Sequence, residues 1–295
     1  MSKPLMIIIN PAAGKGKYKD GLPDALKLLS DAGYCPIVFF TERRGHATEL
    51  AATHGEGFEK LICLGGDGTL AEVIAGLMRI KKRPQIGYIP IGTANDVART
   101  LGLPKDNIIE GVRRFLGGTP KALDTGVRDG GYFNYVAAFG AFTEVSYDTP
   151  QDKKRALGEL AYLIGAAKAL GKLKSRHVKI EYDDGELEGD YLYGSMSNSY
   201  SVAGLIDLPR DVIDLGDGLH ELVVVKKLPN AGQFVKLAAK VLTHDLNSEY
   251  IVILHTKKAV FHFDEPTAWS FDGENGGEHE VITFENSQRA IEIIC

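Results

Sequence analysis

A run of glycines, an aspartate and a threonine holds the clearest chemistry in this sequence. The apolar run Leu61–Leu64 leads into Gly65–Thr69, which reads GGDGT, and apolar residues at helical spacing follow. Glycines let backbone N–H groups approach phosphate oxygens, and the start of a helix adds a positive partial charge. Asp67 is placed to meet a hydrated Mg²⁺, and Thr69 can cap the helix or bind phosphate. The pattern indicates a phosphate site, and the alternative is an ordinary glycine-rich turn.

Two further polar loops follow apolar runs in the first hundred residues. Asn10–Gly16 follows the run Leu5–Ile9, and Pro90–Asp96 follows another such run. Each loop alone is more often a simple turn or a helix cap, with Thr93 or Asn95 as the cap of the second. Ligands of open α/β sheets bind beyond the carboxyl ends of the strands, so three such loops would converge on one cleft.

A third short motif lies near the end of the chain. Asp272–Glu274, which reads DGE, follows the aromatic run Trp269–Phe271. A carboxylate there could act as a general base toward an acceptor hydroxyl, and Gly273 allows tight backbone geometry. On its own, the motif is better explained as a hairpin turn with exposed carboxylates.

The first 120 residues alternate between short apolar runs and helical patterns, which predicts a parallel α/β domain. The expected strands are Leu5–Ile9, Ile37–Phe40, Leu61–Leu64 and Ile86–Ile89. The expected helices are Lys17–Asp31, His46–Thr53, Thr69–Met78, Ala94–Leu101 and Ile108–Leu116.

The pattern changes after residue 120 to alternating strands joined by polar turns, which predicts a second, mostly antiparallel β domain over 121–295. The expected strands are Val178–Tyr182, Gly189–Ser195, Leu219–Val225, Tyr250–Leu254, Ala259–Phe263, Val281–Phe284 and Ala290–Ile294. The last of these could belong to either domain. Two helices are expected in this region, at 155–173 and Ala231–Leu242.

Composition limits the classes of function. The chain has 295 residues, enough for two domains, and a net charge of −5 that gives no overall attraction to nucleic acid. Its three cysteines show neither metal-ligand spacing nor a disulfide framework, and Cys35 and Cys63 are expected to be buried thiols. Such thiols suit a reducing cytoplasm, which is the expected location. The sequence shows no signal peptide and no apolar run of the ~18 residues that a membrane span requires, so any contact with a membrane is expected from the side.

Taken together, the motifs resemble the diacylglycerol kinase catalytic-domain family, in its bacterial lipid-kinase branch. The matching segments are Asn10–Gly14, Gly65–Thr69, Pro90–Arg99, Leu101–Pro104, Asp214–Leu219 and Asp272–Glu274. They cover nearly the whole chain in order. The GGDGT run is shared with NAD kinases, whereas the GTAND run at Gly92–Asp96 paired with the late DGE is more specific to lipid kinases.

The resemblance implies an ATP-dependent kinase that phosphorylates a hydroxyl of diacylglycerol or a related glycerolipid. The implied fold is α/β, with a Rossmann-like three-layer nucleotide-binding domain over 1–120 and a β-sandwich domain for the lipid over 121–295, the active site lying between them. The implied ATP contacts are Asn10, Pro11, Ala12, Ala13, Gly14, Thr41, Gly66, Asp67, Gly68, Thr69, Leu70, Ala71, Glu72 and Thr93.

The resemblance also implies catalytic and metal-binding residues. Glu274 is the implied general base, and Asp67 is the second catalytic residue. A structural Mg²⁺ is implied at Asp217, with main-chain oxygens of Asp214 and Leu219. The expected cofactors are therefore ATP and Mg²⁺.

Two departures from the family pattern keep alternatives open. Ala13 stands where a small polar residue is usual, and Ala71 stands where Asn is usual. A missing hydrogen bond is worth ~1 kcal/mol, so ATP affinity could fall about fivefold per bond. The alternatives are an NAD kinase-like enzyme that acts on a soluble nucleotide, and a nucleotide- or lipid-binding module without turnover.

The predicted helix at 155–173 has an apolar side bordered by basic residues. It would either dock on an anionic membrane surface or pack against the β domain. The expected partners are a lipid substrate and, peripherally, the membrane surface, without nucleic acid. A homodimer is one arrangement that the sequence allows.

Overall fold

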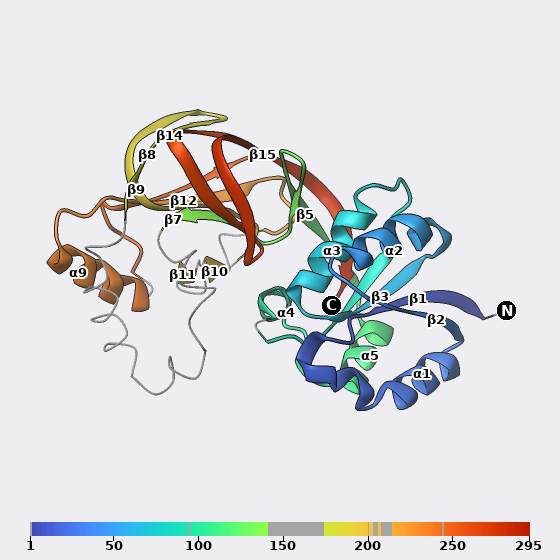
Figure 1. Ribbon diagram of the computed structural model, residues 1–295. Helices are drawn as coiled ribbons and strands as arrows, with labels where there is room; N and C mark the ends of the chain where they lie inside the picture. Colours follow the sequence, from blue (N-terminus) through green and yellow to red (C-terminus); the bar gives the residue numbers. More distant parts are fainter. Residues whose placement is uncertain are drawn as a thin grey trace. The chain divides into compact units, whose positions relative to one another are not determined.

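The computed structural model describes residues 2–93, 95–140, 174–199, 201–202, 206–207, 214–243 and 245–295. The chain divides into two compact units (Figure 1). The first unit consists of Met1–Thr125, Leu215–Asp217 and Ser287–Cys295, and the second consists of Gly126–Asp214 and Gly218–Asn286. The C-terminal segment thus belongs to the same unit as the N-terminus.

A parallel sheet forms the centre of the first unit. Its strands are β1 (Lys3–Ile9), β2 (Tyr34–Phe40), β3 (Lys60–Gly65) and β4 (Gln85–Pro90). They lie in the order β2-β1-β3-β4, and Ile293 and Ile294 near the C-terminus pair in parallel with β4. All four strands that the sequence predicts here are present.

Helices cover both faces of this sheet. They are η1 (Ala13–Lys19), α1 (Leu22–Asp31), α2 (His46–His54), η2 (Gly55–Gly57), α3 (Asp67–Leu77), α4 (Asp96–Leu101) and α5 (Ile108–Gly117). Figure 1 shows α2 and α3 on one face and α1 and α5 on the other. The α1/α5 face buries aliphatic side chains of the strands, including Ile7, Ile62 and Ile89, against Leu29 and Val112.

The helix expected from Lys17 begins only at Leu22. The chain first makes the 3-10 turn η1, in which Gly14, Lys15 and Gly16 all have positive φ, and Gly21 with φ 89° precedes α1. Residues in this left-handed region end a right-handed helix, and glycine adopts it most readily. The helical face predicted by periodicity is nevertheless the buried one, with Leu29 in the core.

The second unit is built mainly of antiparallel strands. Its elements are β6 (Gly131–Phe133), β7 (Val136–Gly140), β8 (Arg176–Tyr182), β9 (Gly185–Ser197), β10 (Ser201–Val202), β11 (Ile206–Asp207), β12 (His220–Lys226), α9 (Ala231–Leu242), β13 (Ile251–Thr256) and β14 (Lys258–Phe271). Two strands, β5 (Pro120–Arg128) and β15 (Glu274–Ile294), run through both units. The sequence predicts no strand at β5, β6, β7, β10 or β11, although the turn Arg128–Gly131 between β5 and β6 is a hairpin-type signal.

Two long strands organise this unit. The first half of β9 and of β14 pairs with β8, and the second half of each pairs with β7. The ladder continues outward from β9 through β12 to β13, and from β14 to β15. Aromatic rings fill the interior, where Trp269 lies 5.1 Å from Phe139 and 5.2 Å from Phe261 between ring centroids. The far end of β14 is therefore firmly packed.

Three further expectations concern single segments. Cys63 is buried as predicted, but Cys35 is exposed because it lies on the edge strand β2. The predicted basic helix at 155–173 lies outside the described residues. Among the described residues, no helix is long and apolar enough to cross a membrane.

Candidate active site

The loops after β1 and β3 are joined by a side-chain hydrogen bond. The Asn10 side-chain amide donates to the Thr69 hydroxyl at 2.9 Å, and Thr69 is buried in the first turn of α3. The Asn10 side-chain oxygen accepts the backbone N–H of Ala12 at 3.0 Å, which closes the turn that follows β1. Asn10 therefore ties its own loop to the GGDGT loop.

The loops after β3 and β4 touch through their glycines. A Cβ atom on Gly92 would lie 2.6 Å from the Cα of Gly66, and one on Gly14 would lie 2.2 Å from the carbonyl oxygen of Ile91. Real Cβ atoms do not approach backbone this closely, so these positions require glycine. The three loops that the sequence singles out are thus in direct backbone contact at the carboxyl ends of β1, β3 and β4.

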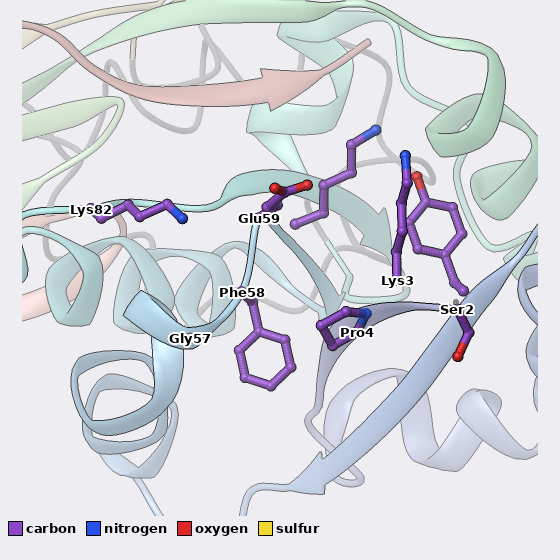
Figure 2. A pocket seen from close by; sticks show the side chains of 9 residues that line it. Ser2, Lys3, Pro4, Gly57, Phe58, Glu59 and Lys82 are labelled. Carbon is purple, nitrogen blue, oxygen red and sulfur yellow. The ribbon is translucent and has the colours of Figure 1, made fainter.

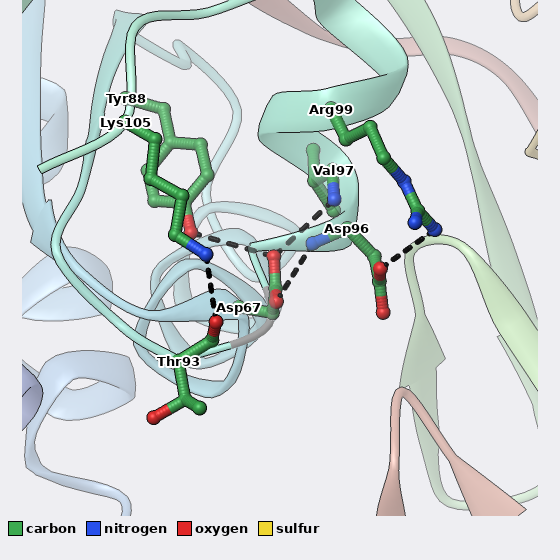
Figure 3. A network of polar contacts seen from close by, with 7 residues as sticks. All are labelled: Asp67, Tyr88, Thr93, Asp96, Val97, Arg99 and Lys105. Carbon is green, nitrogen blue, oxygen red and sulfur yellow. Dashed lines mark hydrogen bonds and ion pairs between the residues drawn. The ribbon is translucent and has the colours of Figure 1, made fainter. Parts of the chain in front are cut away.

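Asp67 lies at the centre of this contact, where it holds the start of α4 (Figure 3). One carboxylate oxygen accepts the N–H of Asp96 at 3.0 Å, and the other accepts the N–H of Val97 at 3.3 Å. Burial raises the pKa of Asp67, and the N–H donors at Asp96, Val97 and Asn95 act in the opposite direction. The carboxylate is thus engaged with the backbone of the loop after β4.

The cap of α4 differs from the one expected. Asn95 occupies the N-cap position with φ 56°, but its side chain accepts no capping bond. Its amide donates instead to the carbonyl of Gly92 at 2.8 Å, and the capping oxygens come from Asp67. The predicted ATP contact Thr93 is exposed, and its carbonyl accepts a bond from Lys105 Nζ at 2.8 Å (Figure 3).

The carboxylate of Glu72 binds the start of α2, as that of Asp67 binds the start of α4. Its two carboxylate oxygens accept the backbone N–H groups of Gly45 at 2.8 Å and Ala47 at 3.2 Å. Gly45 is the N-cap residue of α2, at the end of the loop that follows β2, and Ala47 lies in the first turn of that helix. Thr41, the first residue of that loop, is buried and donates its backbone N–H to Ile9. Glu72 thereby links the helix of the GGDGT loop to the loop that contains Thr41.

The other predicted ATP contacts lie in the loop after β1 and in the GGDGT loop with the first turn of α3, and they differ in exposure. Ala12 is exposed, Leu70 is fully buried, and the rest are half-buried, namely Pro11, Ala13, Gly14, Gly66, Gly68 and Ala71. The side chain of Leu70 faces the core, so only its backbone can face a ligand.

The predicted metal ligands lie at the points along the chain where it changes from one compact unit to the other. Asp214 and Asp217 are exposed, and Leu219 is half-buried. Asp214 and Leu219 fall in the second unit, and Asp217 falls in the first. No group of three or more His, Cys, Asp or Glu side chains that could hold a metal ion occurs in the part of the chain that the structure describes.

Asp124 is a buried aspartate to which the sequence assigned no role. Its hydrogen bonds hold the segment before Asp217. Asp124 accepts the backbone N–H of Arg289 at 2.7 Å and donates its own N–H to Leu215 at 2.8 Å. Arg289 in turn donates from Nε to the carbonyl of Gly216 at 3.1 Å. The available signal was a single carboxylate in the middle of β5, directly after Ala122 and Leu123, and Asp124 is 1% exposed.

The DGE motif forms the turn between β14 and β15, as the sequence predicts. Phe271 pairs with Glu274 across the turn, and Glu274 is exposed. Asp272, in contrast, is buried, and its carboxylate accepts the backbone N–H groups of Asn134, Tyr135 and Val136. The sequence assigned no role to Asn134, whose side chain also donates to Asp272 at 3.0 Å.

A cavity of about 450 Å³ lies elsewhere on the first unit (Figure 2). Its lining includes Lys3 and Pro4 at the start of β1 and Glu59 and Lys60 at the start of β3. The candidate loops follow the other ends of these strands. None of the predicted site residues lines this cavity.

The chain is similar to known proteins of one family. The family model of the diacylglycerol kinase catalytic domain matches residues 4–127. A diacylglycerol kinase of Bacillus subtilis (strain 168) is 34% identical over 273 residues, which cover 92% of this chain and 89% of that protein. One from Staphylococcus aureus (strain bovine RF122 / ET3-1) is 35% identical and covers 100% of this chain and 93% of the relative.

Solved structures agree with the sequence relatives. The crystal structure of a putative diacylglycerol kinase from Bacillus anthracis str. Sterne matches with a TM-score of 0.80 and 27% identity, over 99% of this chain and 95% of that one. A second one from the same organism matches with a TM-score of 0.78 and 26% identity. On this evidence the chain belongs to the diacylglycerol kinase catalytic-domain family.

Proposed function

We propose that this protein is an ATP-dependent lipid kinase that transfers the γ-phosphate of ATP to a hydroxyl of diacylglycerol or a related glycerolipid. The observation that carries the proposal is the mutual contact of the loops after β1, β3 and β4, through Asn10–Thr69 and Gly66–Gly92, in a member of this family. The relatives at 34% and 35% identity are named diacylglycerol kinases, which supports the lipid acceptor.

In this proposal the nucleotide lies along Asn10–Gly14, Thr41, Gly66–Glu72 and Thr93. The first N–H groups of α3 have no partner within the helix and carry its positive partial charge, so they suit the phosphates of ATP. The side chains of Asp67 and Glu72 already accept backbone N–H groups. Their role is therefore to hold the phosphate loop, the start of α4 and the start of α2 in one arrangement.

Mg²⁺ is the second expected cofactor, and the available donors suit it. Mg²⁺ prefers oxygen ligands, and Asp217 offers a carboxylate while Asp214 and Leu219 offer main-chain carbonyls. We propose that these three residues hold a structural Mg²⁺. A Mg²⁺ that accompanies ATP would neutralise charge on the phosphates, and the remaining lone pairs of Asp67 are the ones that its water shell would meet.

Glu274 is the proposed general base. It is exposed at the turn after β14, so its carboxylate is accessible to a substrate hydroxyl. In the transfer step the hydroxyl proton passes to Glu274, the hydroxyl oxygen forms a bond to the γ-phosphorus, and the bond between that phosphorus and the bridging oxygen breaks. ADP leaves with the electron pair.

The domain assignment is part of the proposal. Residues 1–120 would form the Rossmann-like nucleotide-binding domain, and 121–295 would form a β-sandwich domain for the lipid, with the final strand returning to the first. The parallel sheet with helices on both faces and the antiparallel ladders of β7, β8, β9 and β14 support these roles.

Contact with a membrane surface follows from a lipid substrate. We propose that the protein is cytoplasmic and meets the membrane peripherally through the basic segment 155–173. Co-sedimentation with anionic vesicles tests this. Neutralising Lys168 and Lys172 in this segment, together with Lys153 and Lys154 directly before it, should weaken binding. Unchanged binding would rule out this segment and its basic flank as the contact.

The homodimer that the sequence allows has a candidate contact on the edge strand β2. Ile37 and Phe40, with 41% and 44% exposure, are two of the three exposed large hydrophobic side chains among the described residues. An apolar edge strand is a template for pairing with a second copy. Sedimentation velocity of the wild type and of Ile37→Lys tests this, since the substitution should dissociate a dimer formed through β2.

One assay separates the lipid kinase from its alternatives. The protein is incubated with labelled ATP, Mg²⁺, diacylglycerol in detergent micelles and NAD. Label should appear in the lipid and should be lost in Glu274→Gln and Asp67→Ala. Labelled NAD phosphate would make the protein an NAD kinase-like enzyme, and the absence of any labelled product would make it a binding module.

A further inference from the structure

The turn that carries Glu274 is held by more bonds than a hairpin turn needs. Asp272 and Gly273 are its two central residues, with φ values of 50° and 83°. Positive φ at both positions is typical of a tight two-residue hairpin turn, for which Asp-Gly is a favoured pair. An exposed aspartate would satisfy this turn equally well. Asp272 is instead only 8% exposed.

The buried carboxylate of Asp272 accepts bonds from three consecutive residues. Its oxygens receive the N–H of Asn134 at 2.8 Å, of Tyr135 at 3.0 Å and of Val136 at 3.2 Å. The side-chain amide of Asn134 adds a bond at 3.0 Å, and the N–H of Asp272 donates to the carbonyl of Val136 at 2.8 Å. Asp272 therefore attaches the tip of the turn to the segment that leads into β7.

The side chains of Arg128 and Tyr135 also lie close to the turn. The guanidinium of Arg128 lies 4.0 Å from the ring centroid of Phe271, and its charge acts on Asp272. A Cβ atom on Gly273 would lie 3.5 Å from the Tyr135 hydroxyl, so the Tyr135 side chain reaches the turn. Hydrogen bonds between a carboxylate and N–H donors are stronger than neutral ones. The backbone around Asp272 and Gly273 is thus constrained from more than one direction.

Glu274 follows these two residues directly and begins β15. The position of its backbone depends on the turn, and the turn is held through Asp272. Catalytic groups must be held close to their productive geometry, and a misplacement of 1 Å can cost ~100-fold in rate.

We propose that Asp272 is the positioning residue of Glu274, acting by binding the DGE turn to the N–H groups of Asn134, Tyr135 and Val136. The inference rests on the proposed function, in which Glu274 accepts the proton of the lipid hydroxyl. It assigns the aspartate of the DGE motif a task distinct from that of the glutamate. Asp272 itself touches neither substrate nor nucleotide in this account.

A double-mutant cycle on kinase turnover tests the proposal. Asp272→Asn keeps the shape of the side chain but replaces one acceptor oxygen with a donor that faces N–H groups. It should lower kcat by about 10- to 100-fold and change the KM for ATP by less than about twofold. In a Glu274→Gln background the same substitution should lower kcat by less than about twofold, because the residue it positions is already inactive.

Two comparison variants make the cycle specific. Asp184→Asn changes an exposed aspartate in the turn between β8 and β9, and kcat should be unchanged. Asn134→Ala removes only the side-chain donor, so it should lower kcat in the same direction by a smaller factor even if Asp272→Asn does not fold. Equal losses from Asp272→Asn in the wild-type and Glu274→Gln backgrounds, or no effect of Asn134→Ala, would overturn the proposal.

A second measurement separates this inference from the proposed function. If the wild type transfers no phosphate to diacylglycerol, the proposed function fails, and amide hydrogen exchange then judges the attachment alone. In Asp272→Asn the amides of Tyr135, Val136 and Glu274 should exchange faster, while those of β8 and β9 keep their protection. Unchanged exchange at Tyr135 and Val136 would overturn the attachment without reference to turnover.

Discussion

The carboxylate of Asp67 accepts the backbone N–H of Asp96 at 3.0 Å, so two loops that are 29 residues apart in sequence are joined at the start of α4. The neighbouring N–H of Val97 binds the other oxygen at 3.3 Å. The aspartate of the GGDGT run and the first residues after the GTAN run therefore form one structural unit, in addition to any role that Asp67 has toward phosphate or metal.

Replacing Asp67 should disturb both loops. In Asp67→Ala the N–H groups of Asp96 and Val97 lose their acceptors, and an unsatisfied buried group costs about 1–3 kcal/mol. Urea denaturation should show a loss of this size in the free energy of unfolding, and calorimetry should show weaker ATP binding. Asp31→Ala, which removes an exposed carboxylate paired with Lys27, is the control and should change neither. Full stability and full ATP affinity in Asp67→Ala would contradict the role of Asp67 as a link.

The cap of α4 illustrates what sequence reading could and could not find. The order of residues around Asn95 predicts a helix start correctly, and α4 begins at Asp96. The capping side chain comes from Asp67, in a different loop, and nothing in the local sequence indicates that contact. Local patterns identify the end of an element, whereas a bond between two loops depends on how the sheet brings them together.

The contact between the loops after β3 and β4 depends on glycine. In Gly92→Ala the added Cβ would lie 2.6 Å from the Cα of Gly66, so the two loops must separate. We expect ATP affinity to fall by at least about tenfold, measured by calorimetry, because the phosphate loop moves. Gly57→Ala, at a position where a Cβ meets nothing within 4 Å, is the matched control. Similar ATP affinities for both variants would show that the Gly66–Gly92 contact does not shape the site.

The hydrogen bond from Asn10 to Thr69 should be measurable as a coupling. Asn10→Ala and Thr69→Val each remove one partner of the 2.9 Å bond. Each should destabilise the protein by about 1 kcal/mol, and the double variant should lose less than the sum of the two. Thermal or urea denaturation gives these values. Strictly additive losses would indicate that the two side chains do not interact in solution.

For the helix α1, the sequence pattern predicted the buried face correctly but not the first residue. The periodicity of apolar residues predicts a helix that packs on the sheet, and α1 does so through Leu29. Its start was predicted five residues too early, because periodicity does not register the positive φ of Gly21, directly before Leu22. The strand β7 was missed for a related reason, since its pairing partners β9 and β14 lie far away in sequence.

Some residues of the candidate site could be predicted from local motifs, and others could not. The sequence supplied the chemical residues Asp67, Thr69 and Glu274, because their neighbours form short recognisable motifs. It did not supply Asp124 or Asn134. Asp124 accepts the backbone N–H of Arg289, and the Asn134 side chain donates to the carboxylate of Asp272, each more than a hundred residues away in sequence. Such residues have no local motif.

Stability should depend on pH through Asp272. Burial raises the pKa of Asp272 from its ordinary value of 3.8 to about 6, so between these values the folded state holds more protons than the unfolded state. The contribution of this group to the free energy of unfolding is therefore largest at low pH and falls as pH rises through about 6, by at most about 3 kcal/mol.

The comparison with Asp272→Asn isolates this contribution, because other groups titrate alike in both proteins. Urea denaturation from about pH 4 to about pH 7 should show the wild type losing stability relative to the variant as pH rises. The opposite trend would mean that the N–H donors of Asn134, Tyr135 and Val136 lower the pKa of Asp272 by more than burial raises it.

The measurement that tests the central claim most directly is the rate of phosphate transfer from ATP to diacylglycerol by the wild type, Glu274→Gln and Glu278→Gln. Glu278 is exposed further along β15 and serves as the matched control. We expect labelled lipid from the wild type and from Glu278→Gln, and a loss of kcat of at least about 100-fold in Glu274→Gln. Lipid phosphorylation that persists at the wild-type rate in Glu274→Gln, or that never occurs in the wild type, would contradict the account.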